Sequence, residues 1–127
     1  MQEQQLFEYA VLRVVPRVER EEFLNVGVVL YCRKLNFLQC LYEVDVAKLQ
    51  AFYDKIDIAQ LQQYLSAFRM IAEAHPDGGP ISKLDTASRF RWLTATRSTV
   101  IQTSKVHPAF CTNPEEALKK LFAEYVL

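Results

Sequence analysis

The sequence is poor in the residues that form flexible linkers, zinc sites and disulfide frameworks. Its 127 residues include three glycines, five prolines, three cysteines and two histidines. Because glycine and proline are scarce and the length is close to that of a common domain, we expect residues 1–127 to form a single domain. The cysteines have no CxxC spacing and no nearby histidine pair, which argues against a zinc site. We expect neither a metal nor another cofactor.

Long apolar runs and a net charge are missing as well. No uncharged apolar run approaches the ~20 residues that cross a membrane, and the start MQEQQLFEYA lacks the basic and then apolar pattern of a signal peptide. These absences predict a cytoplasmic protein with reduced cysteines and no membrane partner. The formal net charge is zero and the chain has no broad basic face, so nucleic acid is not an expected partner.

Apolar residues make up half of the chain, and their spacing predicts the secondary structure. Runs rich in β-branched and aromatic residues predict strands, and the first run is apolar on both faces, which is typical of a central strand. The short RKLN link predicts an antiparallel hairpin, with Cys32 opposite Phe37 and Cys40 opposite Val29. The three predicted strands span residues 6–15, 25–32 and 37–44.

After Asp45 the apolar residues recur every three or four positions, which is the period of a helix. Asp45, Asp57 and Asn113 are suited to cap helices, and proline and glycine at 75–80 end the second one. The order β-β-β-α-α-(α)-β-α predicts an α+β domain with an antiparallel sheet of about four strands and helices packed on it. The further predicted elements are helices at 46–55, from 58 to the stop at 75–80, at 86–94 and from Asn113, and a strand at 98–103.

The stretch RFRWLTATRSTVIQTSKVHP, residues 89–108, combines arginines, hydroxyl groups and the only tryptophan. Residues 83–107 hold five basic residues and one acidic residue, whereas the remainder holds ten basic and fourteen acidic residues. A guanidinium group matches a phosphate or a carboxylate in shape and charge. Arg89 and Arg97 are therefore candidates for a shared anion site.

Four other residues are expected to serve the fold. Phe90 and Trp92 are expected in the core, because aromatic side chains of a half-apolar domain usually pack there. Gly27 lies inside a predicted strand and indicates a β-bulge or a side chain packed over it. Arg13 lies among apolar strand residues, where a charge needs a partner. We expect Arg13 to pair with the Glu21–Glu22 segment, and the alternative is that it belongs to a polar cleft.

Three segments together carry a family resemblance: YAVLRVVP at 9–16, EEFLNVGVVLY at 21–31 and the stretch at 89–108. In this order they resemble the bacterial domain of unknown function 3037 family. The resemblance implies a small bacterial domain without an established activity, often encoded beside a HipA-like kinase. Lys105 departs from the family pattern, in which a proline follows the serine. The family positions in this chain are Glu22, Asn25, Gly27, Arg89, Arg97, Gln102, Ser104 and His107.

Two classes of function are compatible with these residues. The first is a protein-interaction or accessory module that uses the 89–107 surface. The resemblance suggests a HipA-like kinase as its partner, and exposed strand edges would permit a homodimer. The second is an enzyme or binding protein for an anionic nucleotide-like or phosphorylated small molecule, in which Arg89 and Arg97 hold the anion and His107 or Glu22 moves a proton.

The two classes require different geometry, and the sequence leaves open whether the chain is an enzyme. An enzyme needs its polar residues to converge on one concave pocket. An interaction module instead needs an apolar patch with a polar rim. The candidate polar cluster comprises Glu22, Asn25, Arg89, Arg97, Gln102, Ser104 and His107.

Overall fold

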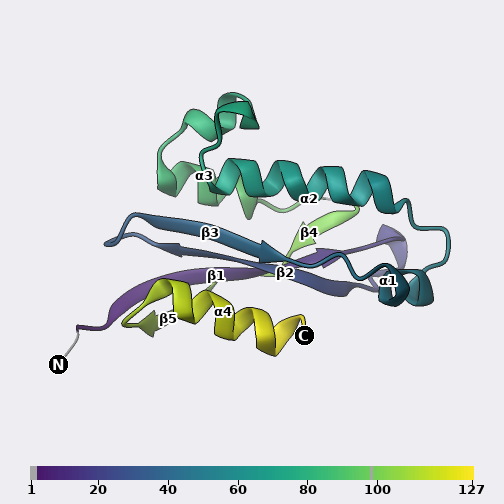
Figure 1. The fold of residues 1–127 in the computed structure, drawn as a ribbon, viewed down its shortest axis with the longest axis horizontal. Helices are drawn as coiled ribbons and strands as arrows, with labels where there is room; N and C mark the ends of the chain where they lie inside the picture. Colours follow the sequence, from purple (N-terminus) through teal and green to yellow (C-terminus); the bar gives the residue numbers. More distant parts are fainter. Residues whose placement is uncertain (1–2, 98) are drawn as a thin grey trace.

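The chain folds into a five-stranded antiparallel sheet with helices on both faces (Figure 1). The structure is a computed structural model that describes residues 3–97 and 99–127. The predicted α+β class is confirmed, with one strand more than the four predicted. The strands are β1 (Gln5–Val14), β2 (Leu24–Cys32), β3 (Phe37–Tyr42), β4 (Ile101–Thr103) and β5 (His107–Cys111), and the helices are α1 (Val46–Phe52), α2 (Ile58–Ala72), α3 (Thr86–Leu93) and α4 (Pro114–Tyr125).

Strand β1 lies at the centre of the sheet, as its two apolar faces predict. The strand order is β3-β2-β1-β4, and β5 pairs with the N-terminal half of β1 on the same edge as β4. Ala10, Leu12 and Val14 of β1 pack towards the larger core, whereas Phe7 packs towards the smaller one. Both faces of β1 are therefore covered, and both of its edges are hydrogen-bonded.

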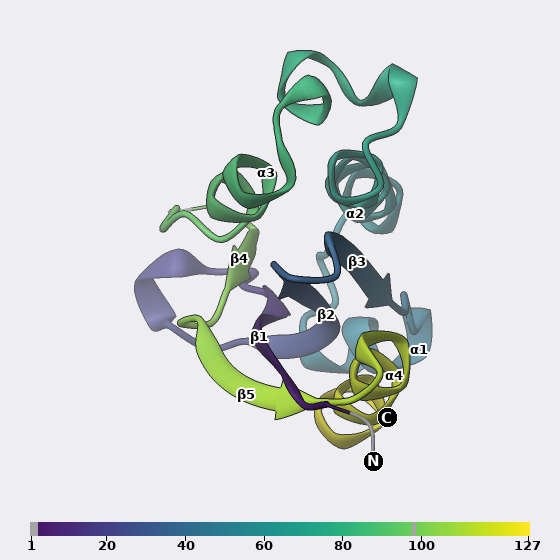
Figure 2. The same cartoon turned by 90° about the vertical axis from the view of Figure 1, so that its left-hand side faces the viewer.

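The sheet separates the hydrophobic core into two layers, and helices cover both of them (Figure 2). Helices α2 and α3 cover one face of the sheet, and α4 covers part of the other. Each of these helices begins at a capping side chain, and so does α1: the residues Asp45, Asp57, Asp85 and Asn113 accept backbone N–H groups of the first turn. In the described part of the chain, no helix is both long enough and apolar enough to cross a membrane.

The predicted hairpin of β2 and β3 has the expected register. Cys32 lies opposite Phe37, and Cys40 lies opposite Val29, so these two thiols are not partners. All three cysteines are free. Burial raises the pKa of the Cys40 thiol to about 12, because the interior disfavours the charged thiolate. Cys40 therefore behaves as a small core residue.

Gly27 lies beside a β-bulge, as expected, and the neighbouring strand β3 rather than a packed side chain approaches it closely. The pairing of β1 with β2 shifts register between Leu12 and Arg13, which leaves Val26 as the extra residue of a β-bulge. A Cβ atom at Gly27 would lie 2.6 Å from the Leu41 carbonyl oxygen and 2.9 Å from the Tyr42 Cβ. Strand β3 thus passes too close to admit any side chain at this position.

The fifth strand, β5, was not predicted, because Pro108 closes the stretch 89–108 and a proline lacks the N–H that strand pairing normally uses. Val11 forms both of its backbone hydrogen bonds with Ser104, on the edge of β1 that pairs with β4 and β5. Because alternate residues of a strand direct their backbone groups to the same edge, the backbone groups of Phe7 and Tyr9 point towards β5. Pro108 lies opposite Glu8, between those positions, so its missing N–H faces outward. A proline is tolerated at such an edge position. Of the predicted strand 98–103, residues 101–103 form β4, and Ser98 lies outside the described residues.

Ser104 joins β4 to β5 along the same edge of β1. Its N–H donates to the Val11 carbonyl at 2.8 Å, and its Oγ accepts the Val11 N–H at 2.8 Å. The hydroxyl therefore replaces a backbone carbonyl where the register changes by one residue between the two strands. This arrangement keeps a buried donor of the central strand satisfied.

Gly27→Ala tests the close packing of β2 against β3. Because the added methyl group meets backbone rather than a flexible side chain, we expect the free energy of unfolding to fall by about 1–3 kcal/mol. Urea denaturation followed by circular dichroism measures this change. An unchanged midpoint would mean that β3 can move away at no cost, contrary to the packing described.

Candidate functional site

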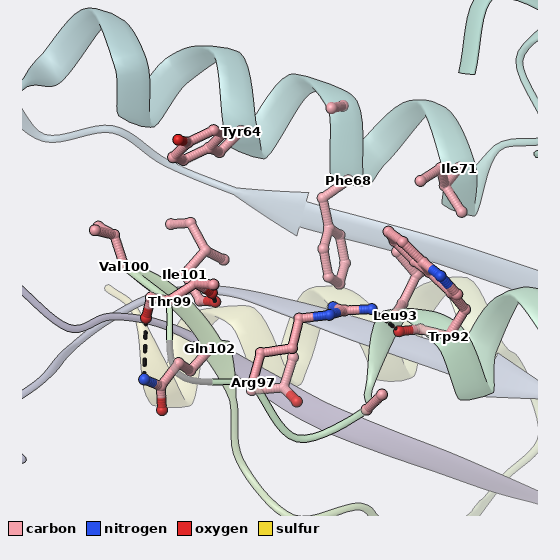
Figure 3. Close-up of a pocket in the computed structure, with 13 residues that line it drawn as sticks. Tyr64, Phe68, Ile71, Trp92, Leu93, Arg97, Thr99, Val100, Ile101 and Gln102 are labelled. Carbon is pink, nitrogen blue, oxygen red and sulfur yellow. Dashed lines mark hydrogen bonds between the residues drawn. The ribbon is translucent and has the colours of Figure 1, made fainter. Parts of the chain in front are cut away.

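A groove of about 510 Å³ opens between α2, the C-terminal end of α3 and β4 (Figure 3). Its walls come from segments that are distant in sequence but are brought together because α2 packs on the face of the sheet beside the edge that β4 forms. It is lined by Tyr64, Ala67, Phe68, Ile71, Trp92, Leu93, Ala95, Arg97, Thr99, Val100, Ile101, Gln102 and Thr103. The lining is mostly apolar.

The apolar floor follows from the helical period of α2. Phe68 and Ile71 belong to the buried stripe of that helix, and Phe68 points down into the groove (Figure 3). Val100 and Ile101 face them from the opposite wall. The β-branched residues that predicted a strand here thus also form the wall of the groove.

Two aromatic side chains that line the groove are exposed to solvent. Tyr64 is 46% exposed, and Trp92 is 40% exposed. The prediction that Trp92 belongs to the core is therefore wrong. Phe90 is a core residue, as predicted: its side chain is 3% exposed, and its ring centre lies 5.1 Å from that of Tyr31. The difference arises because residues two apart on a helix point in nearly opposite directions.

The Arg97 guanidinium lies over the Trp92 ring inside the groove. Its guanidinium carbon is 4.2 Å from the centre of the Trp92 ring, and Nη2 donates to the Trp92 carbonyl (Figure 3). That carbonyl belongs to the last turn of α3, where a cation is favourable. Gln102 donates from Nε2 to the Thr99 carbonyl at 3.0 Å. Among the described residues that line the groove, Arg97 alone is charged.

Arg89 does not join Arg97 in an anion site, contrary to the prediction. It is 8% exposed, and its guanidinium donates to three backbone carbonyls. Nη1 reaches Ile71 at 3.1 Å and Ala72 at 2.7 Å, and Nε reaches Leu84 at 3.0 Å. Two of these carbonyls end α2, where a buried cation also meets the negative end of the helix dipole. Arg89 ties α3 to α2.

Ser104 and His107 also have local partners. The Ser104 hydroxyl accepts from Val11 and donates to the Lys105 carbonyl at 2.9 Å. His107 is an exposed residue of β5, with its ring centre 5.5 Å from that of Tyr9. Neither residue lines the groove.

Glu22 and Asn25 lie on other parts of the surface. Glu22 pairs with Arg20 at 2.6 Å, and both side chains are more than half exposed. Asn25 donates from Nδ2 to the Tyr125 carbonyl at 3.2 Å, at the end of α4. Of the seven candidates, only Arg97 and Gln102 line the groove. Among the described residues, Arg97 therefore shares this groove with neither His107 nor Glu22, the two candidates for moving a proton.

Arg13 does not form the predicted ion pair with Glu21 or Glu22. Its guanidinium carbon lies 3.9 Å from the centre of the Phe23 ring, a cation–π contact that takes the place of a carboxylate. In the strand register it stands opposite Asn25, and among the described residues neither Arg13 Nε nor Asn25 Oδ1 has a hydrogen-bond partner. The predicted ion pair is therefore wrong, and the contact with Phe23 takes its place.

Sequence reasoning missed the α2 side of the groove. Tyr64, Ala67 and Phe68 were interpreted only as parts of an amphipathic helix. Tyr64 lies next to the buried stripe but remains exposed, and this large apolar residue at the border of the stripe is the one available signal. No three His, Cys, Asp or Glu side chains in 3–97 and 99–127 gather as metal ligands.

Arg89→Lys tests the structural role of Arg89. A lysine ammonium is a point charge and cannot reach the three carbonyls in the geometry of the guanidinium fork, so we expect a loss of roughly 2–4 kcal/mol in the free energy of unfolding. Arg91→Lys on the exposed side of α3 is the matched control, with an expected change within about 0.5 kcal/mol. Equal stability of the two variants in urea denaturation would contradict the role assigned to Arg89.

The Tyr9 phenol gives a pH-dependent contribution to stability. Its hydrogen bond with Tyr125, together with partial burial, raises the pKa of Tyr9 from 10.0 to about 12. The folded state then keeps a proton that the unfolded state loses, so this contribution is complete below pH 10 and falls as the pH rises towards about 12. The difference in tyrosinate absorbance between the wild type and Tyr9→Phe measures the pKa. Tyr125→Phe should bring it back towards 10.0, and an unchanged value would refute this cause.

The comparison with known families agrees with the resemblance carried by the three sequence segments. No curated protein and no solved structure matches this chain. The family model described as a protein of unknown function (DUF3037) matches residues 9–126. The match begins within β1 and includes every later strand and helix, and the chain belongs to the DUF3037 family.

Proposed function

We propose that this protein is an interaction module that holds an apolar side chain of a partner protein in the groove between α2 and β4. The observation that carries the proposal is the combination of apolar walls with two exposed aromatic residues, Tyr64 and Trp92. Exposed aromatic side chains beside a pocket are typical centres of binding energy in protein interfaces. Burial of one large apolar side chain contributes roughly 1.5–3 kcal/mol.

Polar groups border the apolar floor, as in most protein interfaces. Thr99 and Gln102 lie on the β4 side, and Arg97 lies across from Phe68 (Figure 3). These groups can orient a partner segment through hydrogen bonds while the apolar floor supplies affinity. A HipA-like kinase, the partner that the family resemblance suggests, is the first protein to test. A second copy of the chain is the competing occupant.

A binding protein for an anionic nucleotide-like or phosphorylated small molecule is the second candidate function. The observation in its favour is the Arg97–Trp92 pair, which offers a cation beside an aromatic face in a groove of ligand size. The groove lining contains no histidine, lysine or carboxylate, so it offers no ordinary general base. This candidate is therefore binding rather than catalysis.

Ala67→Arg tests the groove directly. Ala67 is exposed on α2 and lines the groove, so a long side chain there obstructs the site without replacing a core residue. Ala59→Arg is the matched control, because Ala59 is exposed on the same helix but does not line the groove. We expect Ala67→Arg to lower the amount of co-purified partner about tenfold or more, and Ala59→Arg to leave it unchanged.

The measurement is quantitative mass spectrometry of proteins that co-purify with the tagged chain from its native host. Thermal unfolding by circular dichroism shows that both variants keep the fold. Equal recovery of every partner by the two variants would remove the groove from the interaction. Native mass spectrometry that finds a bound phosphorylated small molecule, lost in Ala67→Arg, would replace the interaction module by the second candidate.

A further inference from the structure

We infer that the partner segment carries an aspartate or glutamate beside its apolar anchor, and that Arg97 binds this carboxylate. The inference rests on the proposed function and names the chemistry of the partner. It follows from the charge of the groove, from the hydrogen-bond donors that Arg97 leaves unused, and from the position of Arg97 beside the apolar floor.

The charge that the groove presents is positive. Among the described lining residues Arg97 alone is charged, and helix α2, which forms one wall, contains no acidic residue. The sequence from 83 to 107 holds five basic residues and one acidic residue. That acid, Asp85, caps the start of α3, at the opposite end of the helix from Trp92. A basic partner segment would meet repulsion here, whereas an acidic one would meet attraction.

The Arg97 guanidinium retains unused hydrogen-bond donors. A guanidinium has five N–H groups, and one Arg97 nitrogen is bonded to the Trp92 carbonyl. Arg17, Arg20 and Arg69 each pair with a glutamate. Arg97 has no such ion pair within the described ranges. It is therefore a cation without an anion, in a site that already offers a surface for binding.

The contacts with Trp92 prepare Arg97 for a carboxylate. The cation–π contact with the indole and the hydrogen bond to the Trp92 carbonyl hold the guanidinium in place, so less side-chain freedom is lost when a carboxylate binds through two parallel N–H···O bonds. The indole face also excludes water from one side of the pair, which strengthens the electrostatic attraction. Figure 3 shows the guanidinium between Phe68 and Trp92, so the carboxylate and the apolar anchor must be close neighbours in the partner sequence.

The experiment is selection of random peptides displayed on phage against the immobilised full chain. Peptides that bind the wild type but not Ala67→Arg are groove-dependent. We expect these peptides to carry an aromatic or aliphatic residue adjacent or next-but-one to an aspartate or glutamate. Selection on Arg97→Glu should instead enrich lysine or arginine at that position. Arg91→Glu is the control, because Arg91 is exposed on α3 and does not line the groove.

Arg97→Gln completes the set, because it removes the charge while it keeps a polar side chain. A selected acidic peptide should bind Arg97→Gln about tenfold more weakly than the wild type in calorimetry, and its binding to Arg91→Gln should be unchanged. Groove-dependent peptides without acidic enrichment, or an enrichment that Arg97→Glu leaves unchanged, would overturn the inference while the proposed function stands. The absence of any groove-dependent peptide would overturn both.

Discussion

The structure depends on the hydrogen bonding of the central strand β1 along both of its edges. One edge bonds to β2, and the other bonds to β4 and β5 in succession. The junction between β4 and β5 could leave the Val11 N–H buried without an acceptor, which costs about 1–3 kcal/mol. The Ser104 hydroxyl supplies that acceptor at 2.8 Å. One side chain thereby allows two short strands to act as a single sheet edge.

The position of β4 on this edge creates the groove. Because β4 lies beside the C-terminal half of β1, it faces α2 and the end of α3 across the upper face of the sheet. Arg89 binds the carbonyls that end α2 and so keeps α3 beside it. The two arginines thus have separate tasks. The buried Arg89 joins two helices and maintains the walls of the groove, and the partly buried Arg97 lies over Trp92 and presents a charge between these walls.

Local features of the chain were predictable because they depend on neighbouring residues. The caps at Asp45, Asp57 and Asn113, the hairpin register and the central strand all follow from side-chain period and short-range hydrogen bonding. The fifth strand was missed because Pro108 is acceptable only where its missing N–H faces outward, and the sequence does not show which edge of a strand is paired. For the candidate site, the stretch 89–108 was found, but its division into groove, core and sheet residues was not.

The residues alone determined the α+β class and the helix starts, and they pointed to a candidate functional stretch rich in arginine. The tertiary structure decided what each arginine does. Arg89 and Arg97 belong to the same stretch 89–108, but the carbonyl ends of α2 surround Arg89, whereas the solvent-facing ring of Trp92 supports Arg97. Such differences come from elements far apart in the chain, whose distances are set by packing rather than by local propensity. The same reason explains why Tyr64 and Phe68 belong to the groove, although within their own helix only the position of Tyr64 at the border of the buried stripe indicates a site.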